Sequence, residues 1–118
     1  MKLLKKAIEA KLPKLYSTDN TPAEAKRLVL KFFATGRGTW FVAEGERQAD
    51  GDVRFFGYVV SALGPDCDEW GYFHLSELEA VRGQFGLRVE RDRWFKPTVF
   101  ADLQEERMIA ERSLAGVR

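Results

Sequence analysis

Cysteine and histidine are nearly missing from this sequence, with Cys67 and His74 the only example of each. A single cysteine excludes an internal disulfide and the paired cysteines of common zinc and redox sites. It also fits a reducing compartment, so we predict a cytoplasmic protein. A Cys67–His74 nucleophile pair would need the two side chains within hydrogen-bond reach, and the strand and loop expected between them do not require this.

Long hydrophobic runs are missing as well. The longest mostly apolar stretch, residues 55–63, is about half the length of a membrane-spanning helix. Basic residues open the sequence, but no apolar run of about seven or more follows them, as a secretory signal would require. We therefore expect no membrane partner.

An excess of one charge is the third absence. Nineteen basic and eighteen acidic residues leave a formal net charge of +1, which excludes the global field of a polyanion-coating protein. What remains is ordinary globular composition, 45% hydrophobic with nine Phe, three Tyr and three Trp. A chain of 118 residues is long enough for one substantial core, so we predict one domain whose charge matters only locally.

Hydrophobic patterning predicts an α+β fold. Apolar residues at helical spacing predict a helix at 3–12, which Pro13 ends. Four segments with the two-residue period of strands are separated by turn-rich segments, so we expect them to pair as neighbours in an antiparallel meander. The third is apolar on both faces, which favours a central position, and its Gly57 is typical of a bulge or close backbone approach. The predicted strands are 27–34, 39–46, 53–62 and 69–74.

Helices are expected after the sheet. Ser76 and Glu79 have the spacing of a capping box, which predicts a short helix. Residues 87–91 are a candidate edge strand, and residues 98–115 are predicted to form a last helix whose charges match the helix dipole. The predicted architecture is an antiparallel meander of about four strands, flanked by an N-terminal, a short capped and a C-terminal helix. We divide it into a domain at 1–97 and a helical extension at 98–118.

The segment 82–96 is the most informative local feature. Its cations outnumber its carboxylates and interleave with Phe85, Trp94 and Phe95, a combination that single-stranded nucleic acid binding uses. Alternatively, ion pairs fasten the segment to the sheet while Trp94 and Phe95 fill the core. The five lysines of residues 1–16 would strengthen the first interpretation if they lay beside this segment. The candidate binding residues are Arg82, Arg88, Arg91, Arg93, Trp94 and Lys96.

A second candidate site is aromatic. Trp40, Trp70 and Tyr72 lie on strands that are adjacent or nearly so. If they share a face, they form either a large core or an exposed patch of the kind that marks partner sites.

Carboxylates offer little chemistry. Glu44 and Glu46 share a strand face and could act with His74 as acid and base, but an exposed strand end explains them as well. The acidic residues around Cys67 lack the spacing of a calcium loop. We predict no catalytic residue, no metal and no cofactor, and a small hydrolase is the least favoured alternative.

Motifs distributed along the chain resemble one bacterial family. They are, in order, MKLLKKAIEAKLPKLYST, KFF, TWFVAEG, GYFHLSELEAVRG and GLRVERDRWFKP, and they span residues 1–97. The chain is similar to the family catalogued as domain of unknown function 2958. The resemblance implies a small bacterial protein, often encoded on plasmids and other mobile elements, with no established activity. His74 stands where the family commonly has Ser.

Two functional hypotheses follow. The first is a non-catalytic binding module whose protein partner is unidentified. The second is association with nucleic acid through segment 82–96 and the lysines of the first helix. The direction in which Arg88, Arg91 and Arg93 point separates them, since an outward positive surface favours nucleic acid.

Overall fold

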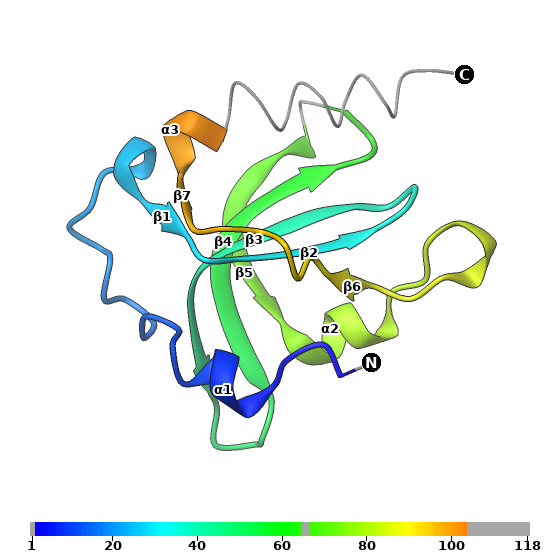
Figure 1. Cartoon of the computed structure of the whole chain (residues 1–118), viewed down its shortest axis with the longest axis horizontal. Coiled ribbons are helices and arrows are strands. Elements are labelled where there is room, and N and C mark those ends of the chain that lie inside the picture. The colour runs from blue at the N-terminus through cyan, green and yellow to red at the C-terminus, as the bar shows by residue number, and fades with distance from the viewer. Residues whose placement is uncertain (1, 65–66, 104–118) are drawn as a thin grey trace.

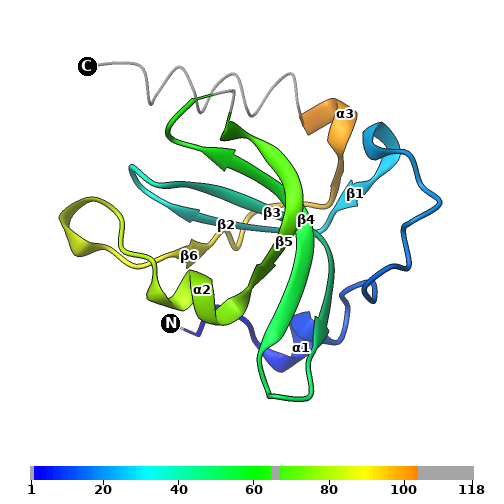
Figure 2. The same cartoon turned by 180° about the vertical axis from the view of Figure 1, so that it is seen from behind.

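The structure, a computed structural model, describes residues 2–64 and 67–103. Its main element is a five-stranded antiparallel sheet in the order β5-β4-β3-β2-β6 (Figure 1 and Figure 2). A second, two-stranded antiparallel sheet pairs β1 (Arg27–Leu28) with β7 (Thr98–Val99). The five strands of the main sheet are β2 (Leu30–Ala34), β3 (Gly38–Arg47), β4 (Val53–Ser61), β5 (Glu69–His74) and β6 (Glu90–Arg91).

The predicted α+β class and antiparallel pairing are confirmed, whereas the predicted count of about four strands is wrong. Strands β2 to β5 form the expected meander. The fifth strand, β6, falls within the candidate edge strand 87–91, but it pairs with β2 because the chain crosses back over the sheet after β5. Local patterning does not reveal such a distant pairing.

The strand predicted at 27–34 is broken at Val29. Val29 lies between β1 and β2, and its N–H donates to the carbonyl of Val42 at 2.7 Å. Leu28 therefore packs with Phe41 on one side of the main sheet, whereas Phe32 packs on the other. The two-residue period predicted for an unbroken strand 27–34 would place Leu28 and Phe32 on one side, and this is wrong because the break interrupts the alternation.

Three short α-helices accompany the sheets within residues 2–64 and 67–103. They are α1 (Lys6–Glu9), α2 (Leu75–Ala80) and α3 (Phe100–Leu103), with single 3-10 turns η1 (Ala23–Ala25) and η3 (Gln84–Gly86). The first is shorter than the predicted helix 3–12, although its hydrogen bonds continue to Leu12, just before Pro13. Residues 104–115 of the predicted C-terminal helix lie outside the described residues. In the part of the chain that is described, no helix is long and apolar enough to span a membrane.

The start of α2 differs from the predicted capping box. Strand β5 runs directly into the helix, so His74 is the N-cap and its N–H donates to Glu77 Oε1 at 3.0 Å. Ser76 lies inside the first turn instead, where its hydroxyl donates to Asp52 Oδ2 at 2.6 Å. Asp52 thereby ties the turn before β4 to the helix.

The sheet is covered on both faces. The N-terminal segment, α2 and Val89 cover one face, where Leu4, Leu12 and Leu78 pack against Phe32 and Phe55. β1 and α3 cover the other face. The second cluster consists of Leu28, Phe41, Ala43, Val60, Phe100 and Leu103. Residues 98–103 thus contribute a strand and two buried side chains to the folded unit.

A β-bulge in β3 determines where Glu44 lies. The register with β4 shifts between Val42 and Glu44, so Val42 pairs with Gly57 and Glu44 pairs with Phe56. The bulge therefore places Glu44 on the face opposite to Val42. A Cβ atom at Gly57 would lie 1.8 Å from the carbonyl oxygen of Phe41. The close approach predicted from this glycine is confirmed.

Candidate binding surfaces

Residues 82–88 form a narrow loop after α2. Arg82 and Arg88 pair as an antiparallel bridge, and the Gly83 N–H donates to the carbonyl of Leu87 at 2.6 Å. The Gln84 N–H donates to the carbonyl of Thr35 at 2.8 Å, which fastens the loop to the turn between β2 and β3. The tip is therefore held by backbone hydrogen bonds at its base and its side.

Two aromatic residues of segment 82–96, Phe85 and Trp94, are exposed to solvent. Phe85 is 96% exposed and adopts a left-handed φ of 59°. Trp94 is 84% exposed, whereas Phe95 packs on Phe41 with ring centroids 5.8 Å apart. Of the two aromatic residues that the alternative interpretation assigns to the core, only Phe95 packs there.

The cations of segment 82–96 divide into three groups. Arg88, Arg93 and Lys96 are exposed. Arg82 is exposed too, but its guanidinium donates to backbone carbonyls at the end of α2, at 2.9 and 3.0 Å. Arg91 is only 7% exposed, and its Nη1 has no hydrogen-bond partner among the described residues. The outward positive surface therefore excludes Arg91.

The carboxylates of this segment do little to neutralise that surface. Asp92 lies 4.0 Å from the ammonium of Lys31 and accepts a hydrogen bond from the Trp94 N–H at 2.9 Å. Its charge is thus directed toward the sheet and the turn that carries Trp94. Glu90 is the one exposed acid of the segment.

The start of the chain packs into the same buried cluster as segment 82–96. In Figure 1 it is drawn near α2 and β6. Leu4 and Val89 belong to the same buried cluster. Lys5 and Lys6 are exposed on this N-terminal segment.

The aromatic residues of the second candidate site do not share one face. Trp40 pairs with Val59 and packs on the side of α1 and α2. Trp70 pairs with Tyr58 on the opposite side, where its ring lies 4.9 Å from that of Phe100. Tyr72 lies two residues further along the same strand as Trp70 and remains 44% exposed.

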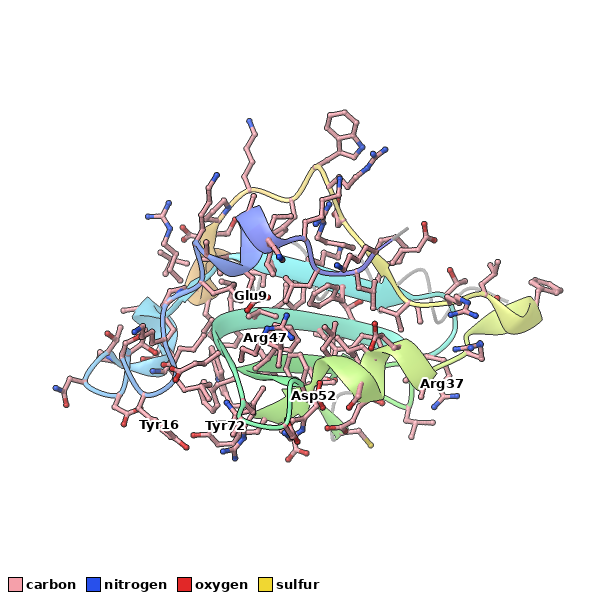
Figure 3. The ribbon with its side chains drawn as sticks, turned by 90° about the horizontal axis from the view of Figure 1, so that it is seen from below. Glu9, Tyr16, Arg37, Arg47, Asp52 and Tyr72 are labelled. Atoms are coloured by element: carbon pink, nitrogen blue, oxygen red, sulfur yellow. The ribbon has the colours of Figure 1, made fainter. Side chains whose placement is uncertain are left out.

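Tyr72 belongs to a group that the sequence did not indicate, which we call the tyrosine cluster: Tyr16, Arg54 and Tyr72. The Arg54 guanidinium lies 3.9 Å from the Tyr72 ring centroid, and its Nη1 donates to the Tyr16 hydroxyl at 3.3 Å. Desolvation is the main cause that raises the pKa of Tyr72, and Tyr16 adds to it. Figure 3 shows Tyr16 and Tyr72 side by side, far from Arg37.

Glu44 serves as an anchor for the loop that carries Tyr16. It is 1% exposed, and its Oε1 accepts the Tyr16 N–H at 2.7 Å. Its Oε2 accepts the Thr18 N–H at 3.1 Å and the Thr18 hydroxyl. Lys26 completes this network by donating to the Thr18 carbonyl at 2.5 Å. Both oxygens of Glu44 are therefore occupied by the protein itself.

The acid–base arrangement considered for a hydrolase is not assembled. In the sheet ladder Arg54 pairs with Glu46 on one side and with His74 on the other, so it separates them. The His74 Nδ1 lies 2.8 Å from Glu77 Oε1 within the capping arrangement of α2. Within residues 2–64 and 67–103, no group of three His, Cys, Asp or Glu side chains is placed to hold a metal ion.

The chain matches the model of a family described as "Protein of unknown function (DUF2958)" over residues 3–108. The matched range includes β7 and α3, which pack into the second buried cluster. No curated protein and no solved structure matches the chain.

Proposed function

Because this chain belongs to the family of proteins of unknown function DUF2958, whose description names no activity, we propose a function from the geometry: a non-catalytic binding module for single-stranded nucleic acid. Segment 82–96 provides the binding surface. The resemblance found in the sequence implies plasmids and other mobile elements, where such a module would meet nucleic acid in the cytoplasm. This setting is part of the proposal.

The exposure of Phe85 carries the proposal. A large apolar side chain that is 96% exposed contributes nothing to the core, and a left-handed φ is costly for a residue with a Cβ atom. Strain of this kind is kept where the surrounding structure enforces it, as the hydrogen bonds of Gly83 and Gln84 do here. An aromatic ring that a fixed backbone carries into solvent is suited to stacking on a base.

The surrounding charge favours a polyanion. Arg88, Arg93 and Lys96 are exposed, and Glu90 is the one exposed acid on this segment. Trp94 follows Phe85 by nine positions, which limits the distance between the two residues to roughly 30 Å at full extension. Sites for single strands cover about 4–16 nucleotides per domain in other folds, so one strand can reach both rings.

The direct test is a titration of a fluorescently labelled twelve-nucleotide single strand, followed by anisotropy at several salt concentrations. Binding is expected at low salt and should weaken steeply as salt rises. Three phosphate contacts predict a slope of log K against log salt of about −2, from roughly −0.7 for each contact. The expected contacts are Arg88, Arg93 and Lys96.

Variants separate stacking from charge. Phe85→Ala and Trp94→Ala should each weaken binding about 5- to 150-fold and leave the salt slope unchanged. Arg88→Gln and Arg93→Gln should each reduce the magnitude of the slope by about 0.7. Leu63→Ala is the matched control, because Leu63 is 87% exposed and lies outside the segment.

Two outcomes contradict the proposal. One is that no salt-dependent binding occurs at low ionic strength. The other is that a glutamate-rich peptide binds more tightly than the oligonucleotide and responds to the same variants. The second result would assign the segment to an acidic protein partner instead.

A further inference from the structure

The tyrosine cluster is preorganised. Tyr16 has a left-handed φ of 70° in the loop between α1 and η1. The backbone N–H groups of Tyr16 and Thr18 donate to the Glu44 carboxylate, which is almost completely buried. A buried carboxylate is costly unless hydrogen bonds compensate for its lost hydration. Here those bonds fix the loop, and the loop carries Tyr16 to Arg54.

The rings of the cluster extend inward as a continuous aromatic layer. Tyr72 lies 6.3 Å from Tyr16 and 5.0 Å from Phe56, and Phe56 stacks on Trp70 at 5.7 Å. The inner rings are half-buried, whereas Tyr16 is 53% and Tyr72 is 44% exposed. The layer supports the outer pair from behind and leaves both accessible to a ligand.

Arg54 is a cation without a carboxylate partner among the described residues. Its register partner Glu46 forms no ion pair with it, and the Tyr16 hydroxyl is the acceptor that its guanidinium reaches. A guanidinium has five N–H donors, most of which are therefore available. A phenol is protonated at neutral pH, and the raised pKa of Tyr72 favours that form further, so its hydroxyl too can donate.

Two acids, Asp19 and Glu46, lie near this group. Asp19, in the same loop as Tyr16, contributes to the raised pKa of Tyr72, and Glu46 is exposed at the end of β3. Neither is bound to Arg54, so an incoming anion would not have to displace a carboxylate from the guanidinium.

These features point to a second ligand. We propose that Tyr16, Arg54 and Tyr72 form an oxyanion site that binds a phosphate or carboxylate group through the Arg54 guanidinium and the two phenolic hydroxyls. The planar fork of arginine matches the paired oxygens of both groups, and stacking on Tyr72 holds that fork in one orientation.

The site is independent of segment 82–96. Arg37 donates to the carbonyl of Arg82 at 3.3 Å and so marks the position of the loop of segment 82–96. In Figure 3 the labelled Arg37 and the labelled tyrosines lie at opposite ends of the molecule. The oxyanion site can therefore be correct if segment 82–96 binds no nucleic acid, and the reverse also holds.

The experiment is an NMR titration of the full chain with sodium phosphate and, separately, with sodium acetate, at constant ionic strength. Backbone amides of Tyr16 and Tyr72 and the Arg54 Nε–H should shift together and reach saturation. Saturation with phosphate alone identifies a phosphoryl ligand, whereas saturation with acetate as well identifies an oxyanion site that also accepts carboxylates.

Arg54→Lys is the decisive variant, since it keeps the charge but removes the fork and the planar stacking. It should raise the dissociation constant measured from the Tyr16 and Tyr72 amide shifts at least tenfold. Tyr16→Phe and Tyr72→Phe should each raise this constant several-fold. Arg93→Gln is the control, because it removes one charge from segment 82–96 and should leave the titration unchanged.

Non-saturating shifts spread over the whole surface would overturn the oxyanion site. So would saturation that is the same in Arg54→Lys as in the original chain. A fold defect in Arg54→Lys is recognised by shifts of amides in α2 and the buried clusters before any ligand is added. In that case the two Tyr→Phe variants, which each remove a single oxygen from an exposed ring, provide the test.

Discussion

At the residue scale, one glycine determines the position of the tyrosine cluster. Gly57 has no Cβ atom, so the backbone of β3 can approach it and form the bulge between Val42 and Glu44. The bulge places Glu44 on the face where the Tyr16 loop lies, and the carboxylate binds that loop. A chemically silent residue thus controls a site on the surface.

Gly57→Ala should lower the free energy of unfolding by about 1–3 kcal/mol or more, because its Cβ atom would collide with a backbone oxygen. It should also shift the Tyr16 amide in an NMR spectrum. Gly71→Ala is the matched control, since Gly71 pairs directly with Gly57 and its added Cβ would meet no atom within 4 Å. The two variants are compared by chemical denaturation, and equal stabilities would contradict the steric account.

At this scale, a residue could be assigned its role from the sequence where the cause of that role is local. Gly57 inside an apolar strand is an unusual residue whose role could be predicted from its own neighbours. Tyr16 could not be connected with Arg54 and Tyr72, because their meeting depends on a bulge and on a buried carboxylate in a different strand. Arg91 illustrates the same point, because its burial depends on β6 pairing with β2.

At the element scale, Asp52 couples the turn before β4 to the first turn of α2. The hydrogen bond from the Ser76 hydroxyl is the main cause that lowers the pKa of Asp52, and the N–H groups of Val53 and Ser76 add to it. The carboxylate therefore supplies from another element the acceptor that an N-cap side chain usually provides.

This lowered pKa predicts sensitivity to acid. A carboxyl whose pKa is lower in the folded state stabilises the fold above its unfolded pKa, near 4, and loses that contribution as the pH falls through the folded value. The difference in unfolding free energy between the original chain and Asp52→Asn should thus be constant above about pH 5 and shrink below about pH 4. Urea denaturation across this pH range measures it.

Ser76→Ala serves as the companion variant, because it removes the main cause of the shift while leaving the carboxyl in place. Its stability difference from the original chain should shrink over the same pH range. A difference that stays constant down to the lowest accessible pH in both variants would contradict the coupling. Both variants keep the acid sensitivity that comes from Glu9, whose pKa is lowered by its hydrogen bond with Arg47.

The elements themselves were predictable to the extent that they are regular. The alternation of β3, β4 and β5 marked these strands closely, and Pro13 marked the limit of the first helical turn. The start of α2 was misplaced because β5 enters it without a loop, so His74 rather than Ser76 occupies the N-cap. The pairing of β1 and β6 depends on partners more than fifty residues away, which no local period can reveal.

At the scale of the whole molecule, residues 98–103 complete the second buried cluster. Phe100 is 6% exposed, and its ring lies 4.7 Å from that of Tyr58 and 4.9 Å from that of Trp70. Leu103 is 2% exposed in the same cluster. The face of the sheet that bears Trp70 would be open without them.

Phe100→Ala should therefore cost about 3–5 kcal/mol of unfolding free energy, the usual range for deleting a buried aromatic ring. It should also increase the accessibility of Trp70 to a fluorescence quencher such as acrylamide. Asp102→Ala is the control, because Asp102 lies in the same helix and is exposed. Similar stabilities for the two variants would show that α3 does not contribute to the core as its burial indicates.

The pairing of the first strands with the last has a consequence for how the chain folds during synthesis. β2 to β5 can form their meander as they leave the ribosome, since each strand pairs with the one made just before it. β1 and the outer edge of β2 can pair only after β7 and β6 have been synthesised. Apolar residues such as Leu28 therefore stay uncovered until almost the whole domain has emerged from the ribosome. Long-range closure of this kind slows folding and lengthens the period in which an open strand edge is able to aggregate.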